Sequence, residues 1–307
     1  IWEQFQSLES KLPVTHDMYL KVWALKKPKL PFDFILFDEA QDANPVLLHL
    51  LQEQQSQLIV VGDRYQQIYS WRGSVNAMST FKTIHSCCLS QSFRFGQSIA
   101  NVANSILKNY LGAAVEIRGN NNIKSLVGAC EPNAIIFRTN GSMLGTLMGL
   151  IKNNEQVYIE GGVKELTSQI RAAICLKKGE RTESSMFDIY KNWQEVEDAA
   201  KDNDELAQFI SLFERFDALS LLDALEKVSS VKDSKNITLT TVHKSKGQQW
   251  DYVRLADDFR YPSPDMAFSN FVWSEEEANL LYVAVTRARK IIDISRCQAV
   301  LHAMITA

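Results

Sequence analysis

The sequence predicts an α/β protein built on parallel sheets with a small helical insertion, and three observations predict it. Short apolar runs of strand length alternate with segments of helical period, a pattern typical of parallel strands joined by helices. A length of 307 residues is enough for two globular units that each bury a core. Between residues 163 and 231 the strand-like runs stop, and the pattern becomes wholly helical and more charged.

Composition limits the classes of function. Hydrophobic residues make up 46% of the chain and charged residues 22%, as in an ordinary soluble protein. The formal net charge of −3 provides no general basic field, so any contact with nucleic acid must be local to a cleft. The sequence contains no signal peptide and no membrane-length apolar run, so we expect no association with a membrane.

The cysteines and the first residue carry two further expectations. Five cysteines form an odd set without C-x-x-C spacing, which argues against a disulfide framework or a zinc site and for a reducing compartment. We therefore expect an intracellular protein, nuclear if its source is eukaryotic and cytoplasmic if it is bacterial or viral. Because the chain opens on Ile1 rather than on methionine, we also expect a fragment of a longer protein.

The first hundred residues contain a strand that ends in two acids. Trp2, Phe5 and Leu8 have helical spacing, and a second helix is expected from Thr15 to residue 23. Residues 32–37 then form an apolar strand followed by two carboxylates, Asp38 and Glu39. At the carboxyl end of a parallel strand, one carboxylate can hold Mg²⁺ through its water shell and the other can accept a proton from water. The alternative is an ordinary acidic loop.

A helix and a second strand follow the two acids. Asn44 and Pro45 are expected to begin a helix that buries Val46, Leu47, Leu50 and Leu51. Residues 58–61 form a strand that breaks at Gly62 and Asp63 into a loop.

The loop that ends at residue 74 offers groups for two ligands. Gln66 is an amide that could sense a phosphate oxygen, whereas Tyr69, Trp71 and Arg72 offer flat faces and a guanidinium to nucleic-acid bases. The alternative is a surface turn whose aromatic residues complete a core.

The rest of the chain supplies a second set of strands. They are expected at residues 85–89, 134–139, 156–160, 237–242, 251–256 and 291–295. A helix after residue 96 has one apolar face, formed by Ile99, Val102, Ala103, Ile106 and Tyr110. Residues 118–123 are expected to be a loop. Leu206, Phe209, Ile210 and Phe213 form one helical stripe, which is more typical of a core than of a partner site.

Residues 275–290 are expected to form a helix with an acidic first turn and a basic last turn. Its core face would be Leu281, Ala284, Val285 and Ala288. Arg287 and Arg289 would point to different sides, so at most one of them can reach a given phosphate.

No phosphate loop is recognisable in the sequence. The turn at Lys244–Gly247 resembles one but lacks the G-x-x-x-x-G-K-[ST] spacing, and no other stretch of the 307 residues has that spacing.

Five segments resemble, in order, motifs II to VI of the UvrD-like superfamily-one DNA helicases. They are FDEAQD (37–42), GDRYQQIYSWRGS (62–74), QSFRFG (91–96), TTVHKSKGQQWD (240–251) and LLYVAVTRARK (280–290). Within that group, THDMYLKVW (15–23), VRLADDF (253–259), the SFRFG form of motif IV and NLLYVAVTRARK are most similar to the F-box DNA helicase family.

The resemblance implies a fold of two RecA-like parallel-sheet domains. Residues 1–88 would be the C-terminal part of the first domain, which is incomplete because no P-loop is present. Residues 89–161 and 232–307 would form the second domain, and residues 162–231 a helical insertion within it.

The resemblance also implies an ATPase site. Asp38 would organise Mg²⁺, Glu39 would activate the attacking water, and Gln66 would position that water or sense the γ-phosphate of ATP. Gln41 would link the nucleotide to motif III. The candidate arginine fingers, which would stabilise the transferring phosphoryl group, are Arg94 and Arg287.

The remaining implied contacts concern the nucleoside and the DNA. Phe93 would stack on adenine, and Gly247 and Gln249 would lie at the nucleotide, although Gln249 replaces the glutamate that usually meets the ribose. The residues implied to hold single-stranded DNA are Tyr69, Trp71, Arg72, Thr241 and His243. Arg64 and Tyr65 stand where motif III often has acidic residues.

Two classes of function follow from these residues. The first is the C-terminal portion of an ATP-dependent DNA helicase or translocase that moves three-prime to five-prime on single-stranded or forked DNA in recombination or repair. The second is a non-catalytic remnant that binds DNA or a partner. Carboxylates and arginines at every matching ATPase position favour the first class.

Overall fold

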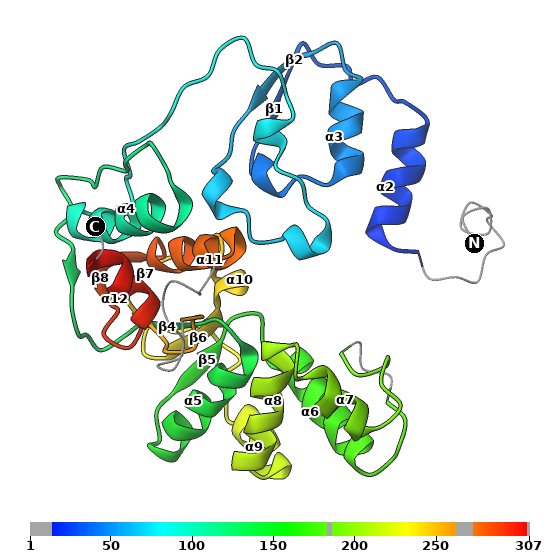
Figure 1. Cartoon of the computed structure of the whole chain (residues 1–307), viewed down its shortest axis with the longest axis vertical. Coiled ribbons are helices and arrows are strands. Elements are labelled where there is room, and N and C mark those ends of the chain that lie inside the picture. Colours follow the sequence, from blue (N-terminus) through cyan, green and yellow to red (C-terminus); the bar gives the residue numbers. More distant parts are fainter. Residues whose placement is uncertain (1–13, 183–185, 262–272, 306–307) are drawn as a thin grey trace. The chain divides into compact units, whose positions relative to one another are not determined.

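The computed structural model describes residues 14–182, 186–261 and 273–305, and the chain divides into two compact units, residues 1–88 and 89–307 (Figure 1). The expected helical spacing of Trp2, Phe5 and Leu8 lies outside the described residues. Each unit is built on its own parallel sheet, with two strands in the first unit and six in the second. These sheets confirm the expected α/β fold.

Unit 1 pairs strand β1 (Phe34–Phe37) with strand β2 (Gln57–Val60) in parallel, with Phe34 opposite Gln57. Helix α2 (His16–Leu25) precedes β1, and helix α3 (Pro45–Gln52) connects the two strands. The side chain of Asn44 caps α3 as expected, because its Oδ1 accepts a hydrogen bond from the backbone N–H of Val46 at 2.8 Å. Leu48, rather than Val46 or Leu47, is buried with Leu50 and Leu51.

Four short 3₁₀ turns complete unit 1. They are η1 (Ala40–Asp42), η2 (Arg64–Gln66), η3 (Ser70–Arg72) and η4 (Ala77–Ser79). A small core joins Ala40, Ala43, Leu48 and Ala77 to partly buried side chains of both strands. On β1 and β2, Phe34, Leu36 and Ile59 are exposed. Parallel sheets are normally covered on both faces, so these exposed side chains depart from the usual pattern.

The six strands of unit 2 lie in the order β3-β8-β7-β4-β6-β5, and all of them are parallel. Their bounds are Leu126–Val127 (β3), Ala134–Phe137 (β4), Val157–Ile159 (β5), Ile237–Thr241 (β6), Trp250–Leu255 (β7) and Ala288–Asp293 (β8). The central strand β4 is buried along its whole length, as a strand covered on both faces must be.

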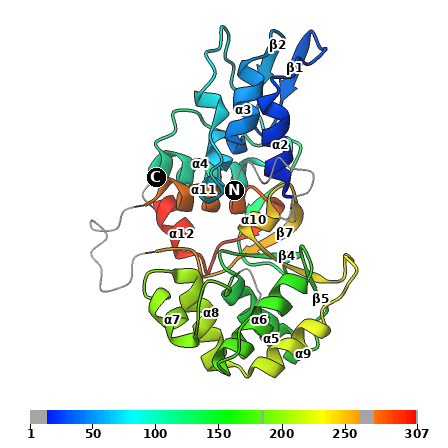
Figure 2. The ribbon, with the colours of Figure 1, turned by 90° about the vertical axis from the view of Figure 1, so that its right-hand side faces the viewer.

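Helices cover both faces of this sheet. Their bounds are Gln97–Leu111 (α4), Asn140–Lys152 (α5), Lys164–Lys177 (α6), Trp193–Ala199 (α7), Asp204–Arg215 (α8), Ala218–Glu226 (α9), Val242–Ser245 (α10), Glu275–Val285 (α11) and Gln298–Ile305 (α12). Figures 1 and 2 show α4 and α11 on one side of the sheet and α5, α8 and α9 on the other.

The helical segment α6–α9 shares its core with the sheet. Leu206 and Phe209 of α8 are buried in one cluster with residues of β4, β5 and α5, and Ile210 and Phe213 pack against that cluster. The stripe on α8 is therefore a core face.

Two expectations about secondary structure are wrong. Residues 85–89 form no strand; Leu89 is 91% exposed, so the apolar run has no sheet neighbour to pair with. The expected helix 275–290 ends at Val285, because Ala288 pairs with Trp250 of β7 and begins β8. Arg289 therefore lies on a strand, where it contacts Asp251 at 3.5 Å. Pairing with a neighbouring strand, which no local pattern reveals, overrides helical propensity here.

Candidate functional site

The two candidate carboxylates follow β1 directly. Asp38 is exposed, and its Oδ1 accepts a hydrogen bond from the backbone N–H of Glu39 at 2.8 Å. Glu39 has φ 51° and ψ 38°, a left-handed conformation that costs a non-glycine residue free energy and is common at functional sites. The Nε2 of Gln41 donates to Glu39 Oε2 at 2.6 Å. The glutamate side chain is thus held from within its own turn.

A chain of hydrogen bonds links this turn to the loop after β2. Gln41 is buried, and its Oε1 accepts from the backbone N–H of Asp63 at 3.1 Å. The carboxylate of Asp63 accepts from the N–H of Tyr65 at 3.0 Å and from Gln66 Nε2 at 2.9 Å. Glu39 and Gln66 are therefore connected through two intermediate residues of one unit, Gln41 and Asp63.

Gly62 is required for this connection. A Cβ atom at position 62 would lie 2.6 Å from Gln41 Oε1 and 3.1 Å from the backbone nitrogen of Ala40. Any side chain here would push the Gln41 amide out of its place.

The end of the same loop carries the aromatic and cationic groups. The Arg72 guanidinium lies 5.5 Å from the ring centroid of Tyr69 and 4.7 Å from that of Trp71. Trp71 is 63% exposed, whereas Ile68 is fully buried. Ile68, and not Trp71, therefore fills the core beneath this loop. Burial, together with the negative charge of Asp42, raises the pKa of the Tyr69 phenol, which stays protonated at neutral pH.

In unit 2, the two candidate arginine fingers meet at one residue, Thr286. Arg94 Nη1 donates to the backbone carbonyl of Thr286 at 2.9 Å. Arg287 is buried, and its Nη2 donates to Thr286 Oγ1 at 3.1 Å, its Nε to the carbonyl of Val283 at 2.9 Å and its Nη1 to the carbonyl of Gln248 at 3.4 Å. Residues almost two hundred positions apart in sequence are thus brought together.

The other predicted residues of unit 2 differ in exposure. Phe93, next to Arg94, is 81% exposed, as a stacking platform must be. Gly247 has φ 82° in the turn before Gln248, and Gln249 is exposed. His243 is half-buried in α10, but Thr241 is 6% exposed at the end of β6.

The predicted residues therefore fall into two groups, each built within one unit. Unit 1 holds both carboxylates, Gln41, Gln66 and the aromatic loop, and unit 2 holds both arginines, Phe93 and the turn at Gly247. Sequence reasoning missed Asp63 and Thr286, the residues that join each group. Asp63 follows a strand and a glycine, as a capping residue often does, but Thr286 carries no such signal.

The donor set suits Mg²⁺ at Asp38. Among the described residues no group of three or more acidic, cysteine or histidine side chains could hold a metal, and Asp38 Oδ2 makes no hydrogen bond. A single carboxylate with water and substrate phosphates is the usual coordination of Mg²⁺ at a nucleotide site. Asp38 therefore fits a Mg²⁺ ion that binds together with the nucleotide.

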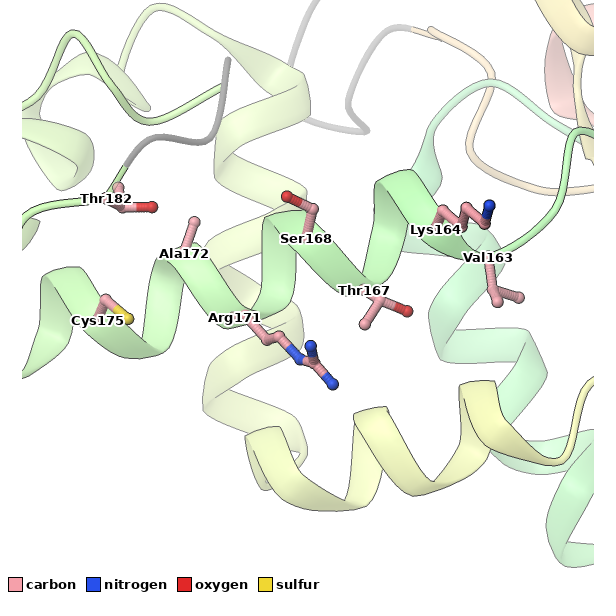
Figure 3. A pocket seen from close by; sticks show the side chains of 8 residues that line it. All are labelled: Val163, Lys164, Thr167, Ser168, Arg171, Ala172, Cys175 and Thr182. Carbon is pink, nitrogen blue, oxygen red and sulfur yellow. The ribbon is translucent and has the colours of Figure 1, made fainter.

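Unit 2 also holds a groove of about 510 Å³ along α6 (Figure 3). Two cations, Lys164 and Arg171, line it together with the hydroxyls of Thr167 and Ser168. Neither cation has an ion pair within the described ranges. None of the sequence-predicted residues lies here. Within the described part of the chain, every helix is too short or too polar to cross a membrane.

Two family models match the chain. The UvrD/REP helicase N-terminal domain matches residues 12–85, and the UvrD-like helicase C-terminal domain matches residues 151–299. The first match covers both candidate carboxylates and the aromatic loop, and the second covers the turn at Gly247 and Arg287.

Individual relatives agree with these matches. The chain is 32% identical to F-box DNA helicase protein 1 of Schizosaccharomyces pombe over 99% of its own length and 39% of the relative. It is 33% identical to F-box DNA helicase 1 of Gallus gallus over 96% of its own length and 32% of that relative. The ATP-dependent DNA helicase Rep of Buchnera aphidicola is 26% identical over 47% of the chain and 22% of the relative. The chain thus spans between about a third and two fifths of the length of the F-box relatives.

Proposed function

We propose, since the chain belongs to the UvrD-like helicase family, that it forms the C-terminal portion of an ATP-dependent DNA helicase. In this proposal ATP hydrolysis moves the protein three-prime to five-prime along single-stranded DNA, at a single-stranded or forked substrate, in recombination or repair. Its setting is intracellular and reducing, which suits its five free cysteines, and nuclear if its source is eukaryotic.

The observation that carries the proposal is the hydrogen-bond chain of unit 1. Glu39, Gln41, Asp63 and Gln66 are joined by contacts of 2.6, 3.1 and 2.9 Å. At its far end, the same short loop continues into Tyr69, Trp71 and Arg72. A movement of the loop that carries Tyr69, Trp71 and Arg72 would therefore be transmitted to Glu39 through these hydrogen bonds. A DNA-stimulated ATPase needs such coupling between its DNA site and its catalytic site.

The chemistry assigned to each residue follows from its position. When bound, ATP with Mg²⁺ supplies an electrophilic γ-phosphorus, which a water molecule can attack. Glu39 accepts the proton of that water, and its left-handed backbone and the Gln41 amide fix its carboxylate. Gln66 orients the water, Asp38 holds the metal, and Arg94 and Arg287 oppose the charge that develops on the phosphoryl oxygens.

The nucleoside and DNA contacts are assigned to the aromatic loop of unit 1 and to residues of motifs IV and V in unit 2. Phe93 stacks on adenine with its exposed ring, and Gln249 offers an amide to the ribose. Trp71 and Tyr69 stack on bases, and Arg72 between them adds a cation. His243 lies near the DNA backbone; Thr241, which is 6% exposed, can act there only through a small shift of the β6–α10 turn.

The alternative is a remnant that binds DNA or a partner without hydrolysis. The aromatic loop alone would serve that function, which would not require Glu39 to be held in a left-handed conformation. The strain at Glu39 therefore favours the catalytic proposal.

The chain of 307 residues on its own should not hydrolyse ATP at a helicase-like rate. No stretch of it has the G-x-x-x-x-G-K-[ST] spacing, so no lysine is placed to neutralise the β- and γ-phosphates. The measurement is phosphate release by the purified chain with and without single-stranded DNA. DNA-stimulated release that co-purifies with the chain and disappears in Glu39→Gln would refute this prediction.

Trp71→Ala should weaken binding of the chain to single-stranded DNA by about 1–3 kcal/mol, with little dependence on base sequence. The physical reason is the loss of one stacking platform that is 63% exposed. Fluorescence anisotropy with labelled oligothymidine and oligoadenine measures the effect.

Gln66→Ala is the matched control in the same loop, because the Gln66 amide donates to the carboxylate of Asp63. It should leave DNA affinity unchanged. Thermal unfolding is measured in parallel, since truncation of a buried tryptophan would cost about 3–5 kcal/mol of stability. A Trp71→Ala variant that unfolds, or that binds DNA normally, means that Trp71 is not a stacking platform.

A further inference from the structure

The two arginines of unit 2 sit at the carboxyl end of α11. The last carbonyl groups of a helix lack partners within the helix and carry a partial negative charge. Arg94 Nη1 contacts one of them, the carbonyl of Thr286, and Arg287 Nε contacts another, the carbonyl of Val283, each at 2.9 Å. The end of α11 thus offsets the repulsion between two cations held close together.

We propose that Thr286 is a positioning residue that holds Arg94 and Arg287 as one preorganised pair; this inference rests on the proposed function. Thr286 is 3% exposed and contacts both side chains, with its carbonyl toward Arg94 and its hydroxyl toward Arg287. Its Oγ1 also donates to the carbonyl of Val283 at 3.0 Å, which aims the oxygen lone pairs at Arg287 Nη2.

The opposite side of Arg287 is held by the turn before β7. The backbone N–H of Trp250 donates to the carbonyl of Arg287 at 3.0 Å, and the carbonyl of Gln248 accepts from Arg287 Nη1 at 3.4 Å. Lys232 Nζ in turn contacts Gln248 Oε1 at 3.2 Å and lies 5.4 Å from the Trp250 ring centroid.

These contacts single out one atom for mutation. Arg287 Nε and Nη1 donate to main-chain carbonyls, whereas Nη2 donates to the Thr286 hydroxyl. A side-chain substitution leaves main-chain carbonyls in place, but it can remove the Thr286 hydroxyl. Thr286→Val removes it at nearly constant volume, and Thr286→Ser retains it.

The test measures the rate of hydrogen exchange at the arginine side chains of the full 307-residue chain by ¹⁵N–¹H correlation spectroscopy. The variants Arg287→Lys and Arg94→Lys assign the signals. Thr286→Val should speed exchange at Arg287 by about 10- to 100-fold, the range for a lost hydrogen bond to a charged group. The Arg94 signals should change less, because Arg94 Nη1 donates to the Thr286 carbonyl, which the substitution keeps. Thr286→Ser should restore slow exchange at Arg287.

Thr240→Val is the matched control, because Thr240 is also fully buried and its hydroxyl also bonds a carbonyl, that of Thr241 at 3.1 Å, but it touches neither arginine. It should lower thermal stability without changing the arginine signals. Unchanged exchange at Arg287 in Thr286→Val, or the same change in Thr240→Val, would overturn the proposal.

A second readout separates this inference from the proposed function. It uses a chimera, called the P-loop chimera, in which a P-loop-bearing segment of a UvrD-like helicase is fused ahead of Ile1. In the P-loop chimera, Thr286→Val should lower kcat about 10- to 100-fold with a smaller change in KM, and Thr286→Ser should recover it. A normal kcat in Thr286→Val would overturn the positioning role. A P-loop chimera without any ATPase activity would count against the proposed function, while the exchange experiment would still decide whether Thr286 holds the pair.

Discussion

In the P-loop chimera, Glu39→Gln should lower the kcat of ATP hydrolysis by about 10²–10⁴-fold, the usual contribution of a general base, while nucleotide affinity stays near its wild-type value. The substitution keeps the size of the side chain and its hydrogen bond with Gln41 but removes the group that accepts the proton. Phosphate release and binding of a fluorescent ATP analogue measure the two quantities.

Glu53→Gln is the control for a change of charge alone. Glu53 is an exposed carboxylate of the same unit, paired with Lys27 at 3.6 Å, and its loss should leave kcat unchanged. If Glu39→Gln retains a near-normal kcat, the proton acceptor must be another residue.

Arg94→Ala should lower kcat in the P-loop chimera by about 10³–10⁵-fold, the range of an arginine finger in other phosphoryl-transfer enzymes. The guanidinium is held by a contact of 2.9 Å with the end of α11, so its direction is fixed before the reaction begins. Arg94→Lys should recover only part of the rate, because an ammonium retains the charge but not the planar fork.

The matched control for Arg94 is Arg171→Ala on α6, which removes an exposed guanidinium without a partner among the residues that the structure describes. It should leave kcat and thermal stability close to wild type. A modest loss of kcat in Arg94→Ala, similar to that of the control, would assign Arg94 to holding α11 rather than to the reaction.

The sequence could predict those parts of the site that depend on the order of the motifs along the chain and on local residue patterns. The sequence pattern predicts Asp38 and Glu39 at a strand end and Asn44 as a helix cap, because strand length and capping chemistry are local properties. The pattern does not decide whether Trp71 is core or surface; the structure does, because Ile68 is buried and Trp71 is exposed.

What the sequence could not predict depends on contacts between distant segments. Strand β8 begins at Ala288 because β7 lies beside it. Residues 85–89 form no strand, because none of the described strands pairs with them. The same holds for Thr286, whose two arginine contacts come from residues 94 and 287. Such contacts are set by tertiary packing, on which the local pattern carries no information.

The most direct test of the proposed function is the rate of ATP hydrolysis by the P-loop chimera as single-stranded DNA is added. The proposal predicts hydrolysis that rises with DNA concentration and is lost in Glu39→Gln, while Trp71→Ala shifts the required DNA concentration upward without lowering the maximal rate. A folded P-loop chimera that binds nucleotide and single-stranded DNA but hydrolyses no ATP at any DNA concentration would contradict it.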